Sequence, residues 1–401
     1  MSDLDSFRSD VAAWLETNAP ESLRGRGASA LEGVWGGKKW AYANPDAKLW
    51  LERCVEQGYT APTWPKEYGG GGLSAAEAKA LGQEMGKLRV PPPLIGFGLT
   101  MIGPTLLQYG TEEQKLEHLP KICRGEIRWC QGYSEPGSGS DLASVQTRAV
   151  RDGDDFIING HKVWTSYADE ADWIFALVRT DPEAKKQEGI TFLLIDMASP
   201  GVSIAPIKLI SGSSPFCETR FDEVRVPVGN ALGEINGGWT VAKALLGHER
   251  SMIANLFGAA PGKKKRAGSA LAAMARDCVG EDPDGRIADP VLRHAIAQNE
   301  MDTRAFGLTV QRAGDSARAG QQPGPESSLF KVYGTELNKR RTELRVRIAG
   351  PQGLGWEGPG FEDEELQCTR DWLRARGNSI EGGTSEIQLN IIAKRVLGLP
   401  D

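Results

Sequence analysis

Apolar residues recur every three or four positions over the first 128 residues, the spacing that gathers them on one face of an α-helix. The first such run has its apolar positions at Leu4, Phe7, Val11 and Trp14. Two tetrapeptides, SAAE at 74–77 and TEEQ at 111–114, carry the capping-box pattern that satisfies the first free N–H groups of a helix. The pattern predicts an N-terminal helical domain at residues 1–128.

Short apolar runs replace the helical pattern between residues 129 and 235. They are β-branched or aromatic, and Gly, Asp or Pro separates them: SVQTRAV, DFIING, HKVWTS, DWIFALV, GITFLLID and FCETRFD. Such runs predict short strands. Because no helical pattern lies between them to carry the chain across a parallel sheet, we expect an antiparallel barrel or sandwich.

The helical period returns from residue 236 to the end of the sequence. It predicts helices at 238–258, 264–278, 287–319, 327–349, 364–376 and 384–396. Long helices joined by short links are typical of a helix bundle. The expected fold class is therefore α+β with three domains: the N-terminal helical domain, a central β domain at 129–235, and a C-terminal helix bundle at 236–401.

Composition narrows the function. The chain has 401 residues and a formal net charge of −6, so it lacks the basic surplus with which proteins bind nucleic-acid phosphates. Its six cysteines form no C-x-x-C pair and its four histidines are scattered, so we expect reduced intracellular thiols and no zinc site. The acidic start MSDLDSFRSD resembles no targeting segment, and no apolar stretch is long enough for a transmembrane helix. We therefore expect a cytoplasmic protein without a membrane span.

One segment, WCQGYSEPGSGSDL at 129–142, looks like a phosphate-binding loop but has no lysine. It matches neither the P-loop nor the dinucleotide fingerprint. A strand-like start runs into Ser134, Glu135 and Pro136, and small residues follow up to Ser140 and Asp141. Because small residues let the backbone approach a ligand closely, the loop is a candidate binding site of another kind.

This loop, together with several other stretches, resembles the acyl-CoA dehydrogenase family along the whole chain. The matching stretches are YGTEEQKLEHLPKICRGE, GYSEPGSGSDLASVQTRA, INGHKVWTS, FDEVRVPVGNALGE, GGWTVAKALLGHER and IEGGTSEIQLNIIAKRVLGLP. Two features are diagnostic together: the S/T-E-P-G-x-G-S-D loop and the K-x-W-x-T/S that follows it. Within the family, the closest likeness is to the large subunit of bacterial pimeloyl-CoA dehydrogenase.

The resemblance implies FAD as the cofactor. In the family, the residues before Glu-Pro lie along the flavin ring and hydrogen-bond its pyrimidine edge; here they are Tyr133 and Ser134. Reduced flavin gathers negative charge at that edge, which fixed N–H and O–H dipoles stabilise. Other family positions beside the flavin and the bound thioester are matched by Trp164, Thr165, Ser166 and Ser140. Taken alone, Trp164 is better explained as a buried aromatic residue of the β domain.

The adenosine half of FAD is matched less completely. Many family members carry R-x-x-F-G after the second bundle helix, and this sequence does not. The stretch RIAGPQGLG keeps Gly350 and Gly353 of another flavin-contacting turn but has Arg347 in place of the usual glutamine. Thr384 and Glu386 lie in GTSEIQ, a stretch that approaches the cofactor in the family.

The implied reaction removes the α-proton of an acyl thioester while the β-hydrogen leaves as hydride to flavin N5. The family places the base at one of two positions that converge in space. One lies directly before a Gly-Thr near the C-terminus, where Gly382 stands here with Glu381 one residue away. The other lies on the first long bundle helix, where this chain has Glu249. Arg250 matches a family arginine near the CoA moiety.

The neighbours of Glu249 favour it independently of the resemblance. Apolar residues stand three and four positions away on both sides: Leu245, Leu246, Met252 and Ile253. Glu249 therefore lies on an apolar helical stripe, where burial would raise its pKa toward that of a working base. Two alternatives stay open: Glu249 as a structural residue paired with Arg250 or another cation, and Glu381 as the base.

The resemblance also implies partners. They are an acyl-CoA substrate, electron-transfer flavoprotein as the electron acceptor, and further subunits in a homotetramer or in a heterotetramer with a related small subunit. Other roles for the chain are a noncatalytic or cofactor-poor subunit of a paired catalytic chain, or an oxidase or desulfinase on the same scaffold. Because the walls of an acyl pocket carry no motif, the sequence does not give the length, branching or ring content of the acyl group.

Overall fold

A computed structural model describes residues 3–25, 33–257, 269–318, 324 and 327–400, without the side chains of 248–257, 317–318 and 327. The chain forms two compact units. The first consists of Met1–Ile207 with Pro215–His248, and the second of Lys208–Ser214 with Glu249–Asp401. The domain boundaries expected at 128 and 235 remain predictions.

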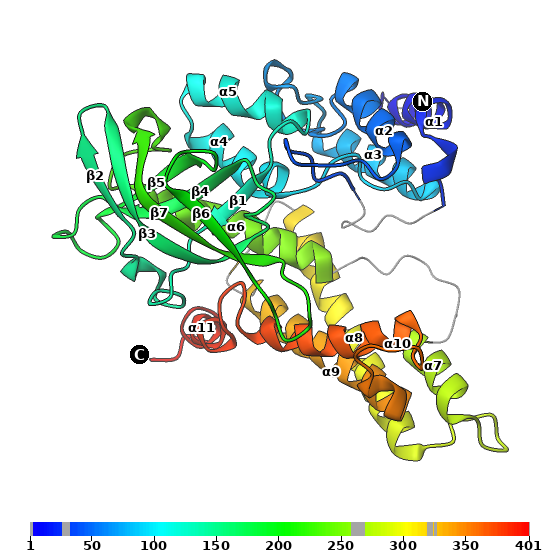
Figure 1. Ribbon diagram of the computed structural model, residues 1–401. Coiled ribbons are helices and arrows are strands. Elements are labelled where there is room, and N and C mark those ends of the chain that lie inside the picture. The colour runs from blue at the N-terminus through cyan, green and yellow to red at the C-terminus, as the bar shows by residue number, and fades with distance from the viewer. Residues whose placement is uncertain (1–2, 26–32, 258–268, 319–323, 325–326, 401) are drawn as a thin grey trace. The chain divides into compact units, whose positions relative to one another are not determined.

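The first unit begins with helices, as the apolar period predicts (Figure 1). They are α1 (Asp3–Asn18), α2 (Pro45–Glu56), α3 (Ala75–Leu88), α4 (Gly103–Tyr109) and α5 (Glu112–Cys123). Both predicted capping boxes are present, Ser74 with Glu77 at α3 and Thr111 with Gln114 at α5. Val11 of α1 packs into a buried cluster with residues of α2 and α3, so the apolar face identified in the sequence holds these helices together.

The β domain is one seven-stranded sheet. Its strands are β1 (Trp129–Gly132), β2 (Arg148–Asp152), β3 (Asp155–Ser166), β4 (Trp173–Arg179), β5 (Ile190–Asp196), β6 (Val202–Ile207) and β7 (Phe216–Pro227). The order is β1-β4-β2-β3-β7-β6, with β5 paired to β4. Most neighbours are antiparallel, which confirms the expected class.

Two pairings correct the expectation that no strands run parallel. β1 pairs with β4 in parallel over its whole length, and β2 meets β4 in parallel at a single position. A parallel neighbour usually requires a helical crossover, and the sequence shows no helical pattern between these strands. Here the β2–β3 hairpin and its flanking loops carry the chain from β1 to β4, so the direction is restored without an α-helix.

The centre of the sheet is covered on both faces. On β4, Phe175 and Leu177 enter one buried cluster with residues of α4, α5 and the start of α6 (Gly238–Phe257), while Ile174 and Ala176 enter another with residues of β3 and β7. Strands buried on both faces have continuous apolar sequences instead of alternating ones. This explains the runs DWIFALV and GITFLLID, and it gives β1 and its following loop a rigid support.

The second unit contains the remaining helices. They are α7 (Ala270–Val279), α8 (Pro290–Arg318), α9 (Ser327–Ala349), α10 (Asp363–Ala375) and α11 (Ser385–Ile391). α8 begins at Pro290, later than predicted, because Asp289 caps it with its side chain and proline suits a first helical position. A π-helical turn at Ile392–Val396 continues α11, as the apolar period predicted. The predicted residues 264–268 lie outside the described residues.

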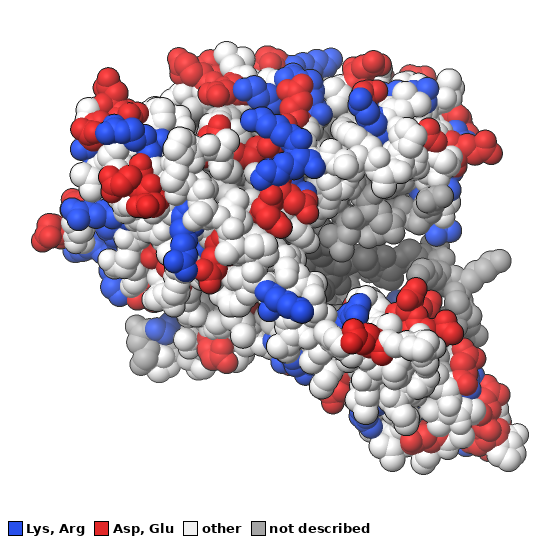
Figure 2. All heavy atoms as spheres, in the orientation of Figure 1, with Lys and Arg blue, Asp and Glu red and all other residues white. Residues whose placement is uncertain are grey.

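On the face drawn in Figure 2, lysines and arginines are interspersed with aspartates and glutamates. In the part of the chain that the structure describes, no helix combines the length and apolar character of a transmembrane segment.

His118 is a buried histidine of α5. Its ring lies edge-on to Trp129 and Trp173, with centroids 5.2 and 4.8 Å away. Burial lowers the pKa of His118 to about 4, so the ring is neutral at pH 7.

Acidification is therefore expected to destabilise the protein through His118. In the unfolded chain the histidine has a pKa of about 6.5, so it binds a proton below that pH, whereas the folded chain keeps the ring neutral. Stability is therefore lost as the pH falls below ~6.5. The loss is about 2 kcal/mol between pH ~7 and ~5. We expect His118→Phe to flatten the pH dependence of the free energy of urea unfolding by this amount. The matched change at the exposed His294 should leave the dependence unaltered; an equal effect of both changes would contradict the assignment.

Candidate functional site

The loop between β1 and β2, residues 133–147, is built around a buried ion pair. Lys162 of β3 is fully buried, and its Nζ lies 2.7 Å from Glu135 Oε1. The same ammonium donates to the carbonyl oxygens of Tyr133 at 3.1 Å and Leu177 at 2.7 Å. Glu135 in turn accepts the backbone N–H groups of Gln146 and Thr147. One pair of charges thus joins both ends of the loop to β3 and β4.

The protonation of this pair follows from its surroundings. Burial alone would raise the pKa of Glu135, but the charge of Lys162 and the hydrogen bonds to the carboxylate together lower it. Burial lowers the pKa of Lys162 to about 8, and Glu135 opposes that shift. Both groups are therefore charged at neutral pH.

The middle of the loop is fastened from inside. The backbones of Glu135 and Ser138 hydrogen-bond each other, and the Ser138 hydroxyl donates to the carbonyl of Asp141 at 2.8 Å. Arg179 donates from Nη2 to the carbonyl of Ala143 at 2.6 Å. Since the inner contacts hold the backbone, the small residues at 139 and 140 are left exposed on the outside, where a ligand can reach them.

The predicted ligand residues of this loop differ in their placement. The ring of Tyr133 is buried in the core and lies edge-on to Phe175 and Phe192, so only its backbone is suited to meet a ligand. Ser134 is half-buried, and its carbonyl accepts the N–H of Val163 at 2.9 Å. Ser140 is exposed on the loop. The hydroxyls of Ser134 and Ser140 therefore remain candidates.

Trp164 is not the buried β-domain aromatic of the alternative interpretation. Its side chain is 54% exposed, and its backbone has a φ of +60°, which non-glycine residues seldom adopt. The pairing of β3 with β7 shifts register between Lys162 and Thr165, as at a β-bulge. The bulge turns the indole out of the sheet, where the ring of Phe216 lies edge-on to it with the ring centroids 6.0 Å apart.

The residues beside Trp164 suit a flat ligand with polar edges. Thr165 is fully buried and, among the described residues, its hydroxyl has no hydrogen-bond partner. Ser166 is half-buried at the end of β3. A strained, exposed indole, hydroxyls on two adjoining segments and an exposed small-residue loop form a surface that fits a flavin ring.

The second group of predicted residues lies in the other unit, at the turn before α11. Arg374 donates to Glu381 at 2.7 Å, and Asn378 donates to its other carboxylate oxygen at 2.5 Å. Gly382 and Gly383 both have positive φ, at +66° and +85°, so this tight turn requires glycine. Glu381 is thus engaged with an arginine and an amide of its own unit.

Thr384 and Glu386 belong to the start of α11. The hydroxyl of Thr384 accepts the N–H of Ile387 and caps the helix. Hydrogen bonds from its own backbone and from Thr384 lower the pKa of Glu386. Both residues therefore have a local structural role in addition to the predicted cofactor contact.

The predicted glycines form a 3₁₀ turn at Gly350–Leu354. Gly350 has a φ of +58°, and a Cβ on Gly353 would lie 2.6 Å from the carbonyl oxygen of Val346. Thr369 donates to the carbonyl of Gly353 at 2.5 Å. Glycine is needed at both positions by the fold itself, whatever the turn binds.

Glu249 and Arg250 lie on helix α6, but their side chains are outside the described residues, as are those of Met252 and Ile253. Of the apolar stripe, Leu245 is fully buried and Leu246 packs against the same cluster. The first half of the stripe thus faces the core.

Three charged residues were missed by the sequence reasoning. Glu135 and Lys162 lie inside the two diagnostic motifs, but the motifs do not show that these two residues form an ion pair. Lys331 of α9 is 5% exposed and, among the described residues, its Nζ has no hydrogen-bond partner. Burial lowers its pKa, while the charges of Glu381, Glu336 and Glu386 oppose that shift. No sequence motif marks it.

Comparison with known proteins gives the same family over all three regions. The models of the acyl-CoA dehydrogenase N-terminal, middle and C-terminal domains match residues 35–126, 130–224 and 236–397. The chain is 38% identical to acyl-CoA dehydrogenase IpdE1 of Mycobacterium tuberculosis, over 100% of this chain and 99% of the relative. The likeness to pimeloyl-CoA dehydrogenase stays a prediction.

Solved structures are also similar to this chain over its whole length. The Tcur3481-Tcur3483 steroid ACAD is 33% identical, with a TM-score of 0.74, over 100% of this chain and 98% of that one. The ChsE4-ChsE5 complex from Mycobacterium tuberculosis is 29% identical, with a TM-score of 0.71, over 100% and 98% of the two chains.

Removing the buried cation of β3 that holds the loop should greatly lower the free energy of unfolding. Lys162→Met leaves the Glu135 carboxylate buried without its partner, and we expect the free energy of urea unfolding to fall by roughly 3–5 kcal/mol. Lys186→Met is the matched control, because Lys186 pairs with Asp141 of the same loop but both side chains are exposed; it should cost about 1 kcal/mol or less. Equal losses in the two variants would show that the buried pair does not organise the loop.

Proposed function

The chain belongs to the acyl-CoA dehydrogenase family and acts on a CH–CH bond of an acyl-CoA, and from this premise we propose that it is the FAD-binding, catalytic chain with Glu249 as its base. The observation that carries the proposal is the loop of residues 133–147 together with Trp164. Their buried support and exposed rim fit a flavin better than they fit a purely structural role.

The proposed flavin contacts come from two segments of the first unit. Trp164 offers a flat apolar surface, and the hydroxyls of Ser134 and Ser166 offer hydrogen bonds to polar ring edges. When bound, FAD supplies the acceptor for the hydride that leaves the β-carbon. Gly350, Gly353, Thr384 and Glu386 are the proposed contacts from the C-terminal unit.

The choice of Glu249 as base is supported by the state of its competitor. A general base must be free to reach the α-carbon, and a carboxylate held by hydrogen bonds must first give them up. Glu381 is bound by both Arg374 and Asn378, and the neighbouring family position is occupied by Gly382. Glu249 follows the buried Leu245 by one helical turn of α6, on the apolar stripe of the sequence.

Each remaining residue has a simple proposed task. Glu249 removes the α-proton of the thioester, Arg250 holds the charged CoA portion, and Ser140 lies near the thioester chain. Two of these side chains are outside the described residues, so their roles rest on the family position and on helix α6.

For the substrate we propose an acyl-CoA with a bulky, ring-bearing acyl group. The support is the likeness to a steroid ACAD, at 33% identity over the whole chain. That relative and ChsE4-ChsE5 are both named as pairs of chains, which supports a heteromer with a related subunit over a homotetramer. Electron-transfer flavoprotein is the proposed electron acceptor.

A second candidate is a noncatalytic subunit in such a pair. It is favoured by one observation, the missing R-x-x-F-G sequence, and by the paired relatives. A chain of that kind would bind little flavin and would not depend on Glu249.

Exchange of the base tests the catalytic proposal. Glu249→Gln keeps the shape and a hydrogen bond but cannot accept the proton, so turnover should fall by roughly 10²–10⁴ while flavin content stays near normal. Glu381→Gln is the matched control and should cost far less. Turnover is measured with a panel of acyl-CoAs, including ring-bearing ones, and an artificial electron acceptor.

Two outcomes would overturn the assignment. An active Glu249→Gln with an inactive Glu381→Gln would move the base to the C-terminal turn. If neither change reduced turnover in the assembled enzyme, another chain would be the catalytic one.

A further inference from the structure

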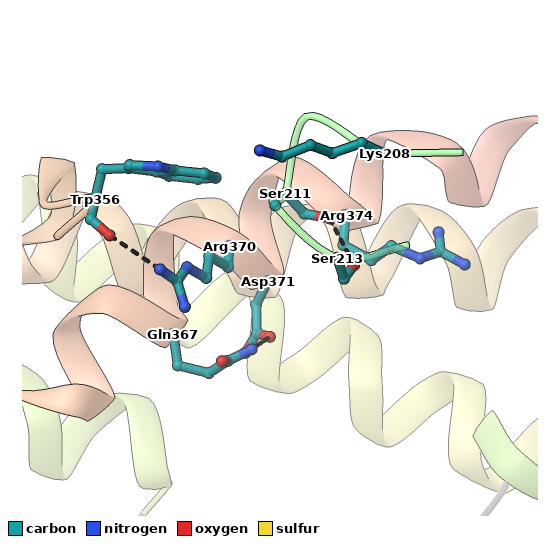
Figure 3. Close-up of a pocket in the computed structure, with 9 residues that line it drawn as sticks. Lys208, Ser211, Ser213, Trp356, Gln367, Arg370, Asp371 and Arg374 are labelled. Atoms are coloured by element: carbon teal, nitrogen blue, oxygen red, sulfur yellow. Dashed lines mark hydrogen bonds between the residues drawn. The ribbon is translucent and has the colours of Figure 1, made fainter. Parts of the chain in front are cut away.

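A pocket of about 430 Å³ lies within the second unit, and none of the residues that line it is a predicted site residue (Figure 3). One wall is the loop Lys208–Ser214, which follows β6, and the other is the second half of α10. Trp356 closes one end. Its size lies in the range of pockets that hold small organic ligands.

The walls are rigid. Gly212 has a φ of +87°, and a Cβ there would lie 3.0 Å from Cζ2 of Trp356, so the loop packs tightly against the indole. Ser211 is buried and its hydroxyl lies 3.1 Å from that of Ser213. Arg370 donates to the carbonyl of Trp356 at 3.0 Å and stands over its ring at 5.2 Å. These contacts fix the loop, the indole and the guanidinium against one another.

The charges of the pocket are not balanced. Its single carboxylate, on Asp371, already accepts from Arg345 and from Gln367, each at 2.7 Å. Arg374 points away from Trp356 in Figure 3 and pairs with Glu381. Within the part of the chain that the structure describes, neither Lys208 nor Arg370 has an acidic partner, and Nε of Arg370 is buried without a hydrogen-bond partner.

We propose that this pocket binds a phosphomonoester of nucleotide size, with the phosphate between Lys208 and Arg370 and its flat ring against Trp356. An arginine already held by one hydrogen bond keeps donors in a fixed fork for phosphate oxygens, and the ammonium of Lys208 points toward the same indole. The partly exposed indole of Trp356 offers a surface on which an aromatic base stacks. The proposal does not rest on the proposed function.

Calorimetric titration of the purified holoenzyme with AMP, inorganic phosphate and adenosine tests it. We expect AMP to bind best, inorganic phosphate more weakly, and adenosine least. Arg370→Gln and Lys208→Gln should each weaken AMP binding about tenfold or more, because each removes a charged donor. Arg370→Lys keeps the charge but lacks the forked donors, so its affinity for AMP should lie between those of the wild type and Arg370→Gln. The control is Arg341→Gln, an exposed arginine of the same unit, which should bind AMP normally.

Several results would overturn the site. They are no AMP binding at millimolar concentration, adenosine binding as tight as AMP binding, or unaltered affinity in both variants. AMP that is displaced by acyl-CoA and insensitive to both variants would be bound at the acyl-CoA site, which would refute the pocket and leave the proposed function standing. Lys208 is exposed on its loop, so its variant keeps the test valid if Arg370→Gln fails to fold.

Discussion

The structure of the candidate flavin site depends on the ion pair of Glu135 with Lys162. Two charges taken out of water are costly unless each is hydrogen-bonded on every side. Here the ammonium reaches Glu135 and two carbonyl oxygens, and the carboxylate also accepts two backbone N–H groups. Because these partners come from the loop of residues 133–147, β3 and β4, the pair helps to set the shape of a loop whose exposed middle consists mostly of small residues.

A rigid support allows strain to be placed beside the loop. β4 is buried on both faces, so its carbonyl at Leu177 is a fixed acceptor for Lys162. Directly after Lys162 the register with β7 slips, and Trp164 adopts a positive φ with its indole exposed. An exposed, strained tryptophan is unfavourable for a fold by itself. A flat ligand on its surface would explain why the strain is kept.

The helices were predictable because their signals are local. Capping boxes and apolar period are recognised within a few residues, and both predicted boxes are present.

The parallel pairing of β1 with β4 was not predicted, because it is set by tertiary packing across a hairpin and not by local pattern. The same reason hid the partnership of Glu135 with Lys162, which are far apart in sequence, and the exposure of Trp164, which depends on a bulge. The alternative base near the C-terminus was predictable in part. The sequence shows Glu381 one residue away from the family position of the base, and the structure adds the arginine that pairs with it.

The most direct test of the central claim is an anaerobic titration of the purified protein with a ring-bearing acyl-CoA, followed by its visible spectrum. A catalytic, flavin-binding chain is predicted to be yellow and to bleach as electrons pass from the acyl group to the cofactor. The test is made on the chain with any copurifying subunit, so that a site completed by a partner is included. A colourless protein, or a yellow one that no acyl-CoA of the panel bleaches, would contradict the account.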